Sequence, residues 1–392
     1  MQEVGFIMNL EPEELYKQRK ERIETTINLK VPDRVPVIFS ENEFAWGFAN
    51  ITQLEFMTEN EKMMMAYEKL FNTFQQDAAF FQPTLFDPLF TVIPSPCMIK
   101  IPGKDLPENS PFQLVESEIM TEDDYKYASK RGYFRTLVKL LPKLRPEIPD
   151  VQNIFTERIT QSVEDMRGSS SNKKRFREWG IPFWIGGDME SPFSLLCLMR
   201  SYEKFCLDMY RRRNIVKLTV DKFIPEIVRM AIGGVKASGI PRAQIGLHRE
   251  SSSTFSLKIF EEIALPMIKK IVELISKENV MTILHCDGDW SPNLEYLTEL
   301  PKGKCILDLD DSTDIFKAKE ILGDRMCITG NLHEPMFAFS TPQKVEEYCK
   351  KLIDIVGEGG GFILKGEPPR ESKLENIKAM VNTAMTYGIY KS

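Results

Sequence analysis

The chain has 392 residues, of which 42% are hydrophobic, so it can bury one large core or the cores of two ordinary domains. A formal net charge of -6 argues against a nucleic-acid-binding protein, and we expect the short basic runs at 173–177 and 211–213 to be solvated surface. The seven cysteines lack CxxC spacing, which excludes a disulfide scaffold and favours a reducing compartment. Since the first residues lack a signal-peptide pattern and no apolar run reaches the ~18 residues of a membrane span, we expect a cytoplasmic protein.

The first predicted element is a helix at about 11–29, part of an N-terminal helical extension of residues 1–33. Short runs rich in β-branched or aromatic residues follow it, separated by stretches long enough for helices, at 34–39, 77–82, 181–187, 243–248, 281–286, 304–310, 326–331 and 360–365. Such β/α units in series predict a single α/β domain of residues 1–392, a TIM (β/α)8 barrel whose bottom the N-terminal helix would cover. A doubly wound open sheet is the alternative, because the sequence does not reveal the order of the strands.

About 95 residues separate the second predicted strand from the third, far more than one connecting helix needs. We therefore predict an insertion or lid region at 83–178. Its first part is rich in proline and aromatic residues, which favours an ordered excursion on the substrate side of the barrel over a flexible tether. A surface loop without contact to the site is the alternative.

Three later helices carry recognisable signals. Residues 265–276 repeat apolar side chains along one face of a helix. Thr341 followed by proline predicts the start of a helix over 342–357. Ser372 and Glu375 predict a capping box in front of a last helix that ends near residue 388.

Polar side chains gather where the predicted strands end. In a TIM barrel these ends form one rim, where ligands and catalytic groups are held. All three histidines fall there together with many carboxylates, and the residues are Asp188, Glu190, His248, Glu250, His285, Asp287, Asp308, Asp310, Asn331, His333 and Glu367. Because clustered carboxylates repel one another, such a rim needs a cation or a substrate to offset their charge. We predict that Glu190, His248 and Glu250 take part in catalysis, with a purely structural role for His248 as the alternative.

The stretch LHCDG at 284–288 is the strongest candidate for a metal site. The two-residue period of a strand places His285 and Asp287 on one face, toward the barrel mouth, and Cys286 on the other. With Glu367 these two residues form a three-ligand set that leaves one position open, the pattern of a catalytic zinc ion. If the chain turns early, Cys286 would replace Asp287 as a ligand. The alternative is an ordinary strand-end histidine held by a carboxylate.

Residues 247–275, 300–332 and 341–390, which include LHRE, LDLDD and LKGEPP, resemble the uroporphyrinogen decarboxylase superfamily, specifically its corrinoid-dependent methyltransferase branch. The resemblance extends over most of the chain and is strongest in its last part. It implies a TIM barrel, a zinc ion in the barrel mouth, and methyl transfer to or from the cobalt of a separate corrinoid protein.

Two departures from the family pattern matter. The decarboxylases carry an arginine-bearing signature near the first strand, whereas this chain reads VIFSENEFAWGF at 37–48, an acidic and aromatic stretch that is unsuited to a polycarboxylate. The thiol-methylating relatives have a His-x-Cys pair at the fifth strand and a further cysteine after the eighth. This chain has His285 and Asp287 at the pair and Glu367 near the late position.

Imidazole and carboxylate ligands make zinc a harder Lewis acid than thiolates do, and such an acid assists the departure of an oxygen. We therefore interpret the chain as a demethylating component, which moves a methyl group from a methoxylated small molecule to the cobalt of a corrinoid (cobalamin) on a partner protein. Aromatic residues near the strand ends could wall an aromatic substrate, namely Phe44, Trp46, Phe80, Phe81 and Trp290.

Three alternatives to this interpretation stay open. They are methyl transfer from a methylcobamide to another acceptor, a decarboxylase-like lyase, and a barrel that serves as a scaffold. A homodimer is compatible with the sequence, and we expect neither a nucleic acid nor a membrane among the partners.

Overall fold

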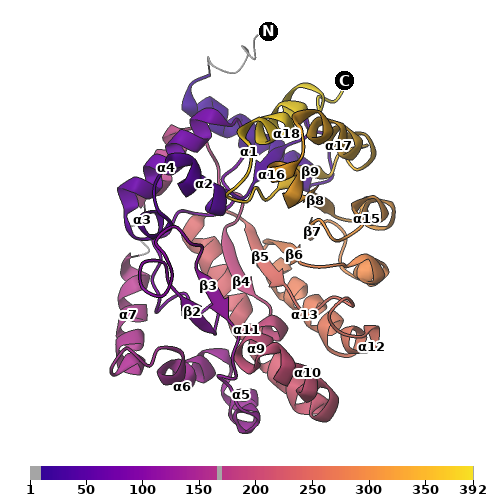
Figure 1. Cartoon of the computed structure of the whole chain (residues 1–392). Coiled ribbons are helices and arrows are strands. Elements are labelled where there is room, and N and C mark those ends of the chain that lie inside the picture. Colours follow the sequence, from indigo (N-terminus) through magenta and orange to yellow (C-terminus); the bar gives the residue numbers. More distant parts are fainter. Residues whose placement is uncertain (1–9, 166–169, 392) are drawn as a thin grey trace.

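The computed structural model of the chain describes residues 10–165 and 170–391. Within them, seven parallel strands form a curled sheet with helices on its outside (Figure 1). Their order is β1-β9-β8-β7-β6-β5-β4, and their bounds are β1 Val37–Phe39, β4 Gly187–Glu190, β5 Arg242–Leu247, β6 Met281–Cys286, β7 Cys305–Leu309, β8 Cys327–Leu332 and β9 Phe362–Gly366. From β4 to β9, strands that follow one another in the chain are neighbours in the sheet, and β1 pairs with β9. This order confirms the predicted TIM-barrel-like fold and excludes the doubly wound sheet.

Residues 77–82, the predicted second strand, lie between β1 and the segment before β4. The Asp77 N–H donates to Val37 O on β1 at 2.8 Å, and an isolated parallel bridge joins Ala79 to Phe183. A regular ladder does not form because the Val37 N–H donates to the side chain of Asp77, at 2.8 Å from Oδ2, and not to a backbone carbonyl. The segment therefore continues the ring of strands, but the prediction of a regular strand over its whole length is wrong.

The predicted third strand is also displaced along the chain. It was expected at 181–187, whereas β4 begins at Gly187 and ends at Glu190. Helix α11 (Arg213–Ser238) packs directly on this start, since a Cβ at Gly187 would lie 2.0 Å from Ala231 O. The sequence pattern identified the apolar residues that precede β4, but it missed the strand itself, which contains the polar residues Asp188 and Glu190.

Helices cover the bottom and the outside of the barrel. They are α1 Pro12–Ile27, α2 Asn42–Ala49, α3 Gln53–Thr58, α4 Asn60–Thr73, α9 Pro192–Arg200, α10 Tyr202–Arg211, α12 Leu257–Ile259, the π-helical turn η2 Phe260–Ala264, α13 Leu265–Ser276, η3 Ser291–Asn293, α14 Leu294–Leu297, α15 Ile315–Leu322, α16 Glu334–Phe339, α17 Pro342–Ile355 and α18 Leu374–Thr386. The predicted helix over 265–276 coincides with α13.

The caps of the last two helices differ in how well they were predicted. The Lys344 N–H donates to the Thr341 hydroxyl oxygen, so α17 begins as expected. The predicted capping box at Ser372 is wrong. The Ser372 hydroxyl donates to Pro369 O at 2.6 Å instead, and α18 begins after an N-cap at Lys373 without a side-chain cap.

Helix α1 covers the end of the barrel where the strands begin, as predicted. Ile23 and Ile27 pack among strand side chains inside the barrel. Arg22 pairs with the fully buried Asp77 at 2.6 Å, and Arg34 pairs with the same carboxylate at 2.8 Å. The pair with Arg22 attaches α1 to the barrel floor, and the pair with Arg34 holds the segment before β1 to the same carboxylate.

Residues 83–178 form their own set of elements, at the lower left of Figure 1. These are β2 Met98–Lys100 and β3 Gln113–Val115, which pair antiparallel, η1 Glu122–Asp124, α5 Tyr125–Arg131, α6 Tyr133–Leu144, α7 Val151–Asp165 and α8 Ser170–Glu178. Arg249 Nη2 donates to Glu116 Oε1 at 2.8 Å, which ties this segment to the loop that follows β5. The segment thus reaches the carboxyl end of the sheet, while its role as a lid stays a prediction.

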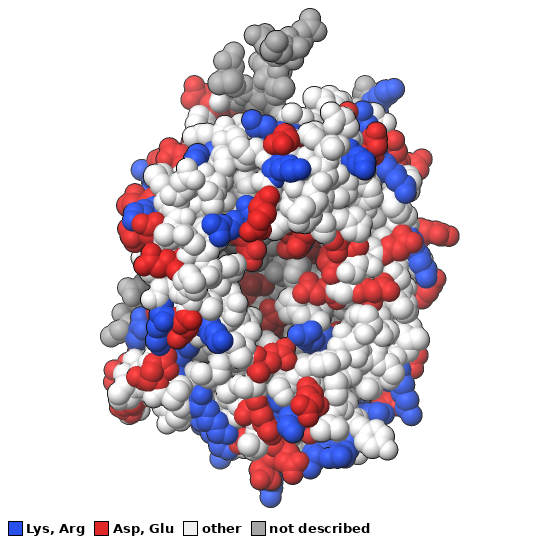
Figure 2. Space-filling view, viewed as in Figure 1, with Lys and Arg blue, Asp and Glu red and all other residues white. Residues whose placement is uncertain are grey.

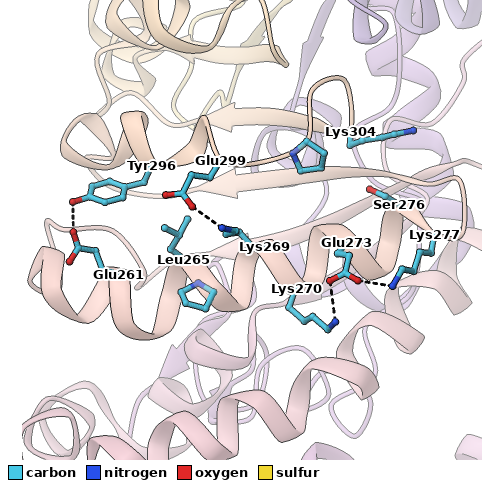
Figure 3. Close-up of a pocket in the computed structure, with 12 residues that line it drawn as sticks. Glu261, Leu265, Lys269, Lys270, Glu273, Ser276, Lys277, Tyr296, Glu299 and Lys304 are labelled. Atoms are coloured by element: carbon cyan, nitrogen blue, oxygen red, sulfur yellow. Dashed lines mark hydrogen bonds and ion pairs between the residues drawn. The ribbon is translucent and has the colours of Figure 1, made fainter.

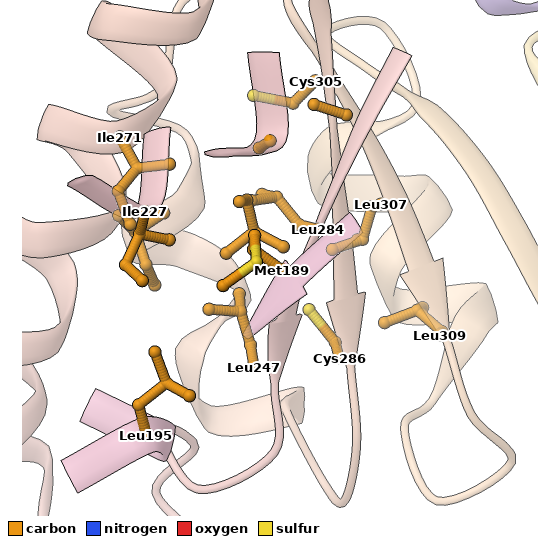
Figure 4. Close-up of a cluster of buried hydrophobic side chains, with 14 of the residues drawn as sticks. Met189, Leu195, Ile227, Leu247, Ile271, Leu284, Cys286, Cys305, Leu307 and Leu309 are labelled. Atoms are coloured by element: carbon orange, nitrogen blue, oxygen red, sulfur yellow. The ribbon is translucent and has the colours of Figure 1, made fainter. Parts of the chain in front are cut away.

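Two apolar layers hold the barrel together. One fills the barrel near its floor, and the larger one lies between the strands and the surrounding helices, as the cluster in Figure 4 shows. In the described part of the chain, no helix combines the length and the apolar character that crossing a membrane requires.

Candidate metal centre at the barrel mouth

The carboxyl ends of the strands bring polar side chains together. His285 on β6 lies in register with Asp308 on β7, and Asp287 follows His285 on the same face two residues later. Lys365 and Glu367 obey the same alternation at the end of β9. Figure 2 shows a hollow in the centre of one face, with acidic side chains gathered around it.

Three of these side chains could hold a metal ion. One ligand atom each from His248, His285 and Asp287 lie within 4.8 Å of one another. Asp287 stands between the imidazoles, with Oδ2 2.5 Å from His248 Nδ1 and Oδ1 3.4 Å from His285 Nε2. Two imidazole nitrogens and one carboxylate are donors that zinc takes in catalytic sites.

Each imidazole has a second carboxylate at its other nitrogen. His248 Nε2 lies 2.7 Å from Glu190 Oε2, and His285 Nδ1 lies 2.7 Å from Asp308 Oδ2. When His285 Nδ1 donates its hydrogen to Asp308, its Nε2 presents a lone pair toward Asp287, while His248 meets Glu190 as an ion pair. Carboxylates orient metal-binding histidines in this way, so the residues present fit a zinc ion.

Asp308 is itself held firmly. Lys365 Nζ donates to both of its carboxylate oxygens at 2.9 Å, and the Thr329 hydroxyl donates to Oδ1. Burial opposes ionisation of Asp308, but Lys365 and His285 outweigh it and hold the pKa of this carboxyl well below its usual range. Asp308 is therefore an ionised acceptor for the His285 N–H.

The charge at the centre favours a cation. Burial disfavours the protonated form of His248, but the hydrogen bonds to Asp287 and Glu190 outweigh it and raise the pKa of His248 to about 11. Burial likewise opposes ionisation of Asp287, yet His248 lowers the pKa of Asp287 below its ordinary value. The carboxylates that hold a proton on His248 would equally stabilise a metal ion in its place.

Gly246 on β5 makes room for this arrangement. A Cβ at this position would lie 2.2 Å from Glu190 Oε2 and 2.7 Å from His248 Nε2. A residue with a side chain would therefore displace the contact between Glu190 and His248.

Glu367 lies in the same mouth but outside the three-residue group. It lines a hollow of about 500 Å³ together with His285, Asp287 and Glu334, among others. Glu367 Oε1 lies 2.7 Å from Lys365 Nζ, and this ion pair partly neutralises the Glu367 carboxylate. Burial, with Glu367 and other acidic neighbours, raises the pKa of Glu334.

Two predicted site residues stand apart from the centre. Cys286 is fully buried and packs in the apolar layer outside the strands, where Figure 4 draws it with Leu247, Leu284 and Leu309. Glu250 is 1% exposed and accepts hydrogen bonds from Ser191 and Ser194, beneath the start of α9. We therefore leave both residues out of the centre.

Most of the aromatic residues named from the sequence are core residues. Phe44, Trp46, Phe80 and Trp290 are at most 2% exposed, and burial at the strand ends accounts for them. Phe81 is only partly buried and lines a separate hollow near β4.

A larger hollow, of about 1000 Å³, lies on the outside of the barrel along α13 (Figure 3). Most of its charged residues pair with one another, as Lys269 does with Glu299 at 2.7 Å and Lys277 with Glu273 at 2.6 Å. No histidine is among the described residues that line it. The candidate metal-binding residues therefore lie at the mouth and not in this hollow.

Sequence reasoning missed the support that Asp308 and Lys365 give to His285. Asp308 was recognised as a rim carboxylate without a partner. Lys365 ends an apolar run and is only 1% exposed, and a lysine that follows GGFIL was the available signal for a buried charge.

Comparisons with known proteins agree with this fold. Residues 177–387 match the family model described as uroporphyrinogen decarboxylase (URO-D), which is more than half of the chain. The uroporphyrinogen decarboxylase of Photorhabdus laumondii is 23% identical over 185 residues, covering 44% of this chain and 50% of that protein. The enzyme of the same name from Aromatoleum aromaticum is 24% identical over 188 residues, covering 44% and 49%. The chain thus spans about half the length of these relatives.

One solved structure is similar over nearly the whole length. A methyltransferase from Methanosarcina mazei matches with a TM-score of 0.65 at 17% identity, covering 94% of this chain and 98% of that one. At this identity the likeness shows a shared fold.

Proposed function

The chain belongs to the uroporphyrinogen decarboxylase (URO-D) family, and on this premise we propose that it is a zinc-dependent methyltransferase of the corrinoid-dependent branch. Its reaction moves a methyl group from a methoxylated small molecule to the cobalt of a corrinoid on a partner protein. One observation carries the proposal: His248 and His285 each face Asp287 with one nitrogen and an outer carboxylate with the other. The fold shared with a methyltransferase supports the choice of reaction.

Each residue of the centre has a distinct task in this proposal. His248, His285 and Asp287 would hold zinc, and Glu190 and Asp308 orient the two imidazoles. A zinc ion bound there would supply Lewis acidity toward the substrate oxygen, which makes that oxygen a better leaving group. Asp308 keeps the proton on His285 Nδ1, so that Nε2 presents its lone pair toward the mouth and could bind a metal ion.

The donor set explains why the proposal specifies an oxygen and not a thiol. The three candidate ligands supply nitrogen and oxygen only, and the sulfur of Cys286 is buried in the apolar layer. Nitrogen and oxygen ligands leave zinc hard, and a hard Lewis acid prefers an ether or alcohol oxygen.

The reaction balances without a further reactant beyond the reduced corrinoid. The bond between the methyl carbon and the oxygen breaks, and its electron pair stays on the oxygen, which takes a proton. The reduced corrinoid supplies the electron pair that forms the bond to the methyl carbon. The hollow at the mouth must therefore admit both the substrate and the corrinoid face of the partner.

The decarboxylase activity of the named relatives fits the mouth less well. Their substrate is a polycarboxylate, whereas acidic side chains surround the hollow, with Asp287, Glu334 and Glu367 among its lining. Like charges at such short range oppose binding. The acidic mouth thus favours the methyltransferase.

A screen of methoxylated aromatics tests the proposal. Zinc-loaded protein is mixed with chemically reduced free cobalamin and one substrate, and the absorbance spectrum of methylcobalamin is followed. We expect methylcobalamin to form with at least one substrate and to disappear when a chelator has removed the metal. Consumption of uroporphyrinogen by the same preparation, without methylcobalamin from any substrate, would replace the proposal by the decarboxylase.

A further inference from the structure

A second hollow lies beside the centre, between the N-terminal helices and β4. It has a volume of about 380 Å³, and its apolar wall includes Phe56 of α3, Tyr67 of α4 and Phe81. The rings of Phe56 and Tyr67 have centroids 5.7 Å apart, so they form one continuous aromatic surface. None of the described residues that line the hollow is a lysine or an arginine.

Asp188 supplies the charged end of this hollow. Its side chain is exposed to the hollow, and the Gln244 Nε2 donates to its Oδ1 at 3.1 Å. In the described part of the chain, Asp188 forms no ion pair, in contrast to Asp77, Asp287 and Asp308. A carboxylate that faces a cavity with only an amide donor can still accept a cation.

Gln244 holds the Asp188 carboxylate in place but does not itself line the hollow. Its side chain is 4% exposed, its amide nitrogen is used by Asp188, and its Oε1 has no hydrogen-bond partner among the described residues. The Asp188 carboxylate, which accepts one amide hydrogen bond and lines the hollow, selects a ligand that brings an N–H group. An aromatic wall next to it selects alkyl groups, above all those that carry a positive charge.

We propose that this hollow binds a small alkylammonium group, with Asp188 as its counter-ion and Phe56, Tyr67 and Phe81 as its walls. The ammonium N–H points to the Asp188 carboxylate, and the alkyl groups lie against the rings. Asp188 is two residues from Glu190 on the same face of β4, so the bound group lies next to the proposed metal centre.

This inference rests on the proposed function, and it restricts the class of molecule that can serve as the methyl donor. The methyl donor carries a protonated amine with an N–H group, in addition to the methyl group that it gives up. Burial and the charge of Glu190 raise the pKa of Asp188 to about 6, while His285 acts in the opposite sense. A cationic ligand would relieve the unfavourable charge that Glu190 imposes on this carboxylate.

Trimethylammonium is the probe, and the nearly isosteric tert-butanol is its neutral counterpart. Binding of each to the full chain is measured by ligand-observed NMR, without corrinoid and without added zinc. We expect trimethylammonium to bind about tenfold to hundredfold more tightly than tert-butanol, as expected for a charge-assisted hydrogen bond in a cavity. Equal affinities for the two probes would overturn the proposal.

Two variants locate the site. Asp188→Asn keeps the shape and should remove most of the preference for the cation, whereas Glu371→Gln, which removes the same charge from an exposed position outside the hollow, should keep it. Phe81→Leu should weaken trimethylammonium several-fold and leave tert-butanol unchanged. Thermal melting of each variant checks its fold, and full retention of cation binding by folded Asp188→Asn refutes the assignment.

The outcome is separable from that of the proposed function. If the protein methylates cobalamin but binds no ammonium probe, only the proposed ammonium site is refuted. A protein that binds the probe through Asp188 but never forms methylcobalamin keeps the site and loses the reaction.

Discussion

The two ends of the barrel treat buried charge in opposite ways. At the floor, Asp77 is enclosed by Arg22 and Arg34, and its carboxylate is neutralised within the fold. At the mouth, carboxylates outnumber cations, and His248 stands between Glu190 and Asp287. At the floor, the two arginines balance the buried carboxylate within the fold. At the mouth, a bound cation would offset the excess of carboxylates.

This contrast assigns stability to one end and chemistry to the other. The floor holds α1 against the strands through arginine pairs and an apolar layer with Ile23 and Ile27. At the mouth, the polar side chains instead orient two imidazoles around one carboxylate. Substitutions at the two ends should therefore separate activity from stability.

The largest expected effect is at the centre. His285→Ala should lower the rate of methylcobalamin formation by more than about a hundredfold, because two remaining ligands hold zinc weakly. His333→Ala is the matched control, since this mouth histidine pairs with Asp311 at 3.2 Å and lies outside the three-residue group. Similar rates in both variants would remove His285 from the mechanism.

A substitution at the barrel floor should lower stability and leave activity unchanged. Asp77→Asn leaves Arg22 and Arg34 without their buried partner, and it should lower the free energy of unfolding by about 3 kcal/mol. Methyl transfer by the folded fraction should stay near the wild-type rate. Urea denaturation measures the first effect, and a variant as stable as wild type would show that the pairs of Asp77 with Arg22 and Arg34 do not stabilise the fold.

The loss of stability at low pH should also depend on Asp77. Burial opposes ionisation of Asp77, but Arg34 and Arg22 outweigh it and lower its pKa to about 2. A lowered pKa stabilises the fold above the unfolded value of ~3.9, and this contribution disappears as the pH falls from there to about 2. Denaturation between pH 5 and pH 2 should show a shallower loss of stability in Asp77→Asn, and parallel curves would contradict the assignment.

The sequence predicted that His285 and Asp287 lie together, and their role as metal ligands stays a prediction. Strand alternation puts His285 and Asp287 on one face, and the structure has them there. The third member of the group is His248 and not Glu367, because β5 is adjacent to β6 whereas β9 lies three strands away. Distance across the barrel does not follow from the spacing along the chain.

The support behind the histidines was harder to foresee. Asp308 meets His285 through the register of two strands, and Lys365 reaches Asp308 from across β8. The lysine after GGFIL indicates a buried charge, but no local sequence pattern indicates which residue each of these side chains contacts. The fold itself was predictable from repeated apolar runs, except at 77–82, where the Asp77 side chain takes the place of a backbone acceptor.

A smaller effect is expected at Asp308, which contacts the proposed zinc ligand His285. Asp308→Asn removes the charge that holds His285 Nδ1–H, and the affinity for zinc should fall about tenfold to hundredfold. Competition with a fluorescent chelator measures this affinity. An unchanged affinity in a folded variant would show that His285 needs no outer carboxylate.

The smallest effect is expected at Cys286. Because its thiol lies in the apolar layer, Cys286→Ser should cost about 1–3 kcal/mol of stability by burying a hydroxyl and should leave zinc binding intact. Loss of metal from this variant, with its fold retained, would bring the cysteine back as a ligand.

The central claim is that the mouth is a metal centre, and the zinc content of the purified wild-type chain tests it most directly. After exposure to micromolar zinc and removal of the unbound ion, elemental analysis should find about one zinc per chain, held by His248, His285 and Asp287. The same measurement on Asp287→Ala should find almost none. A folded wild-type protein that retains no zinc, or an Asp287→Ala variant that retains it fully, would contradict the account.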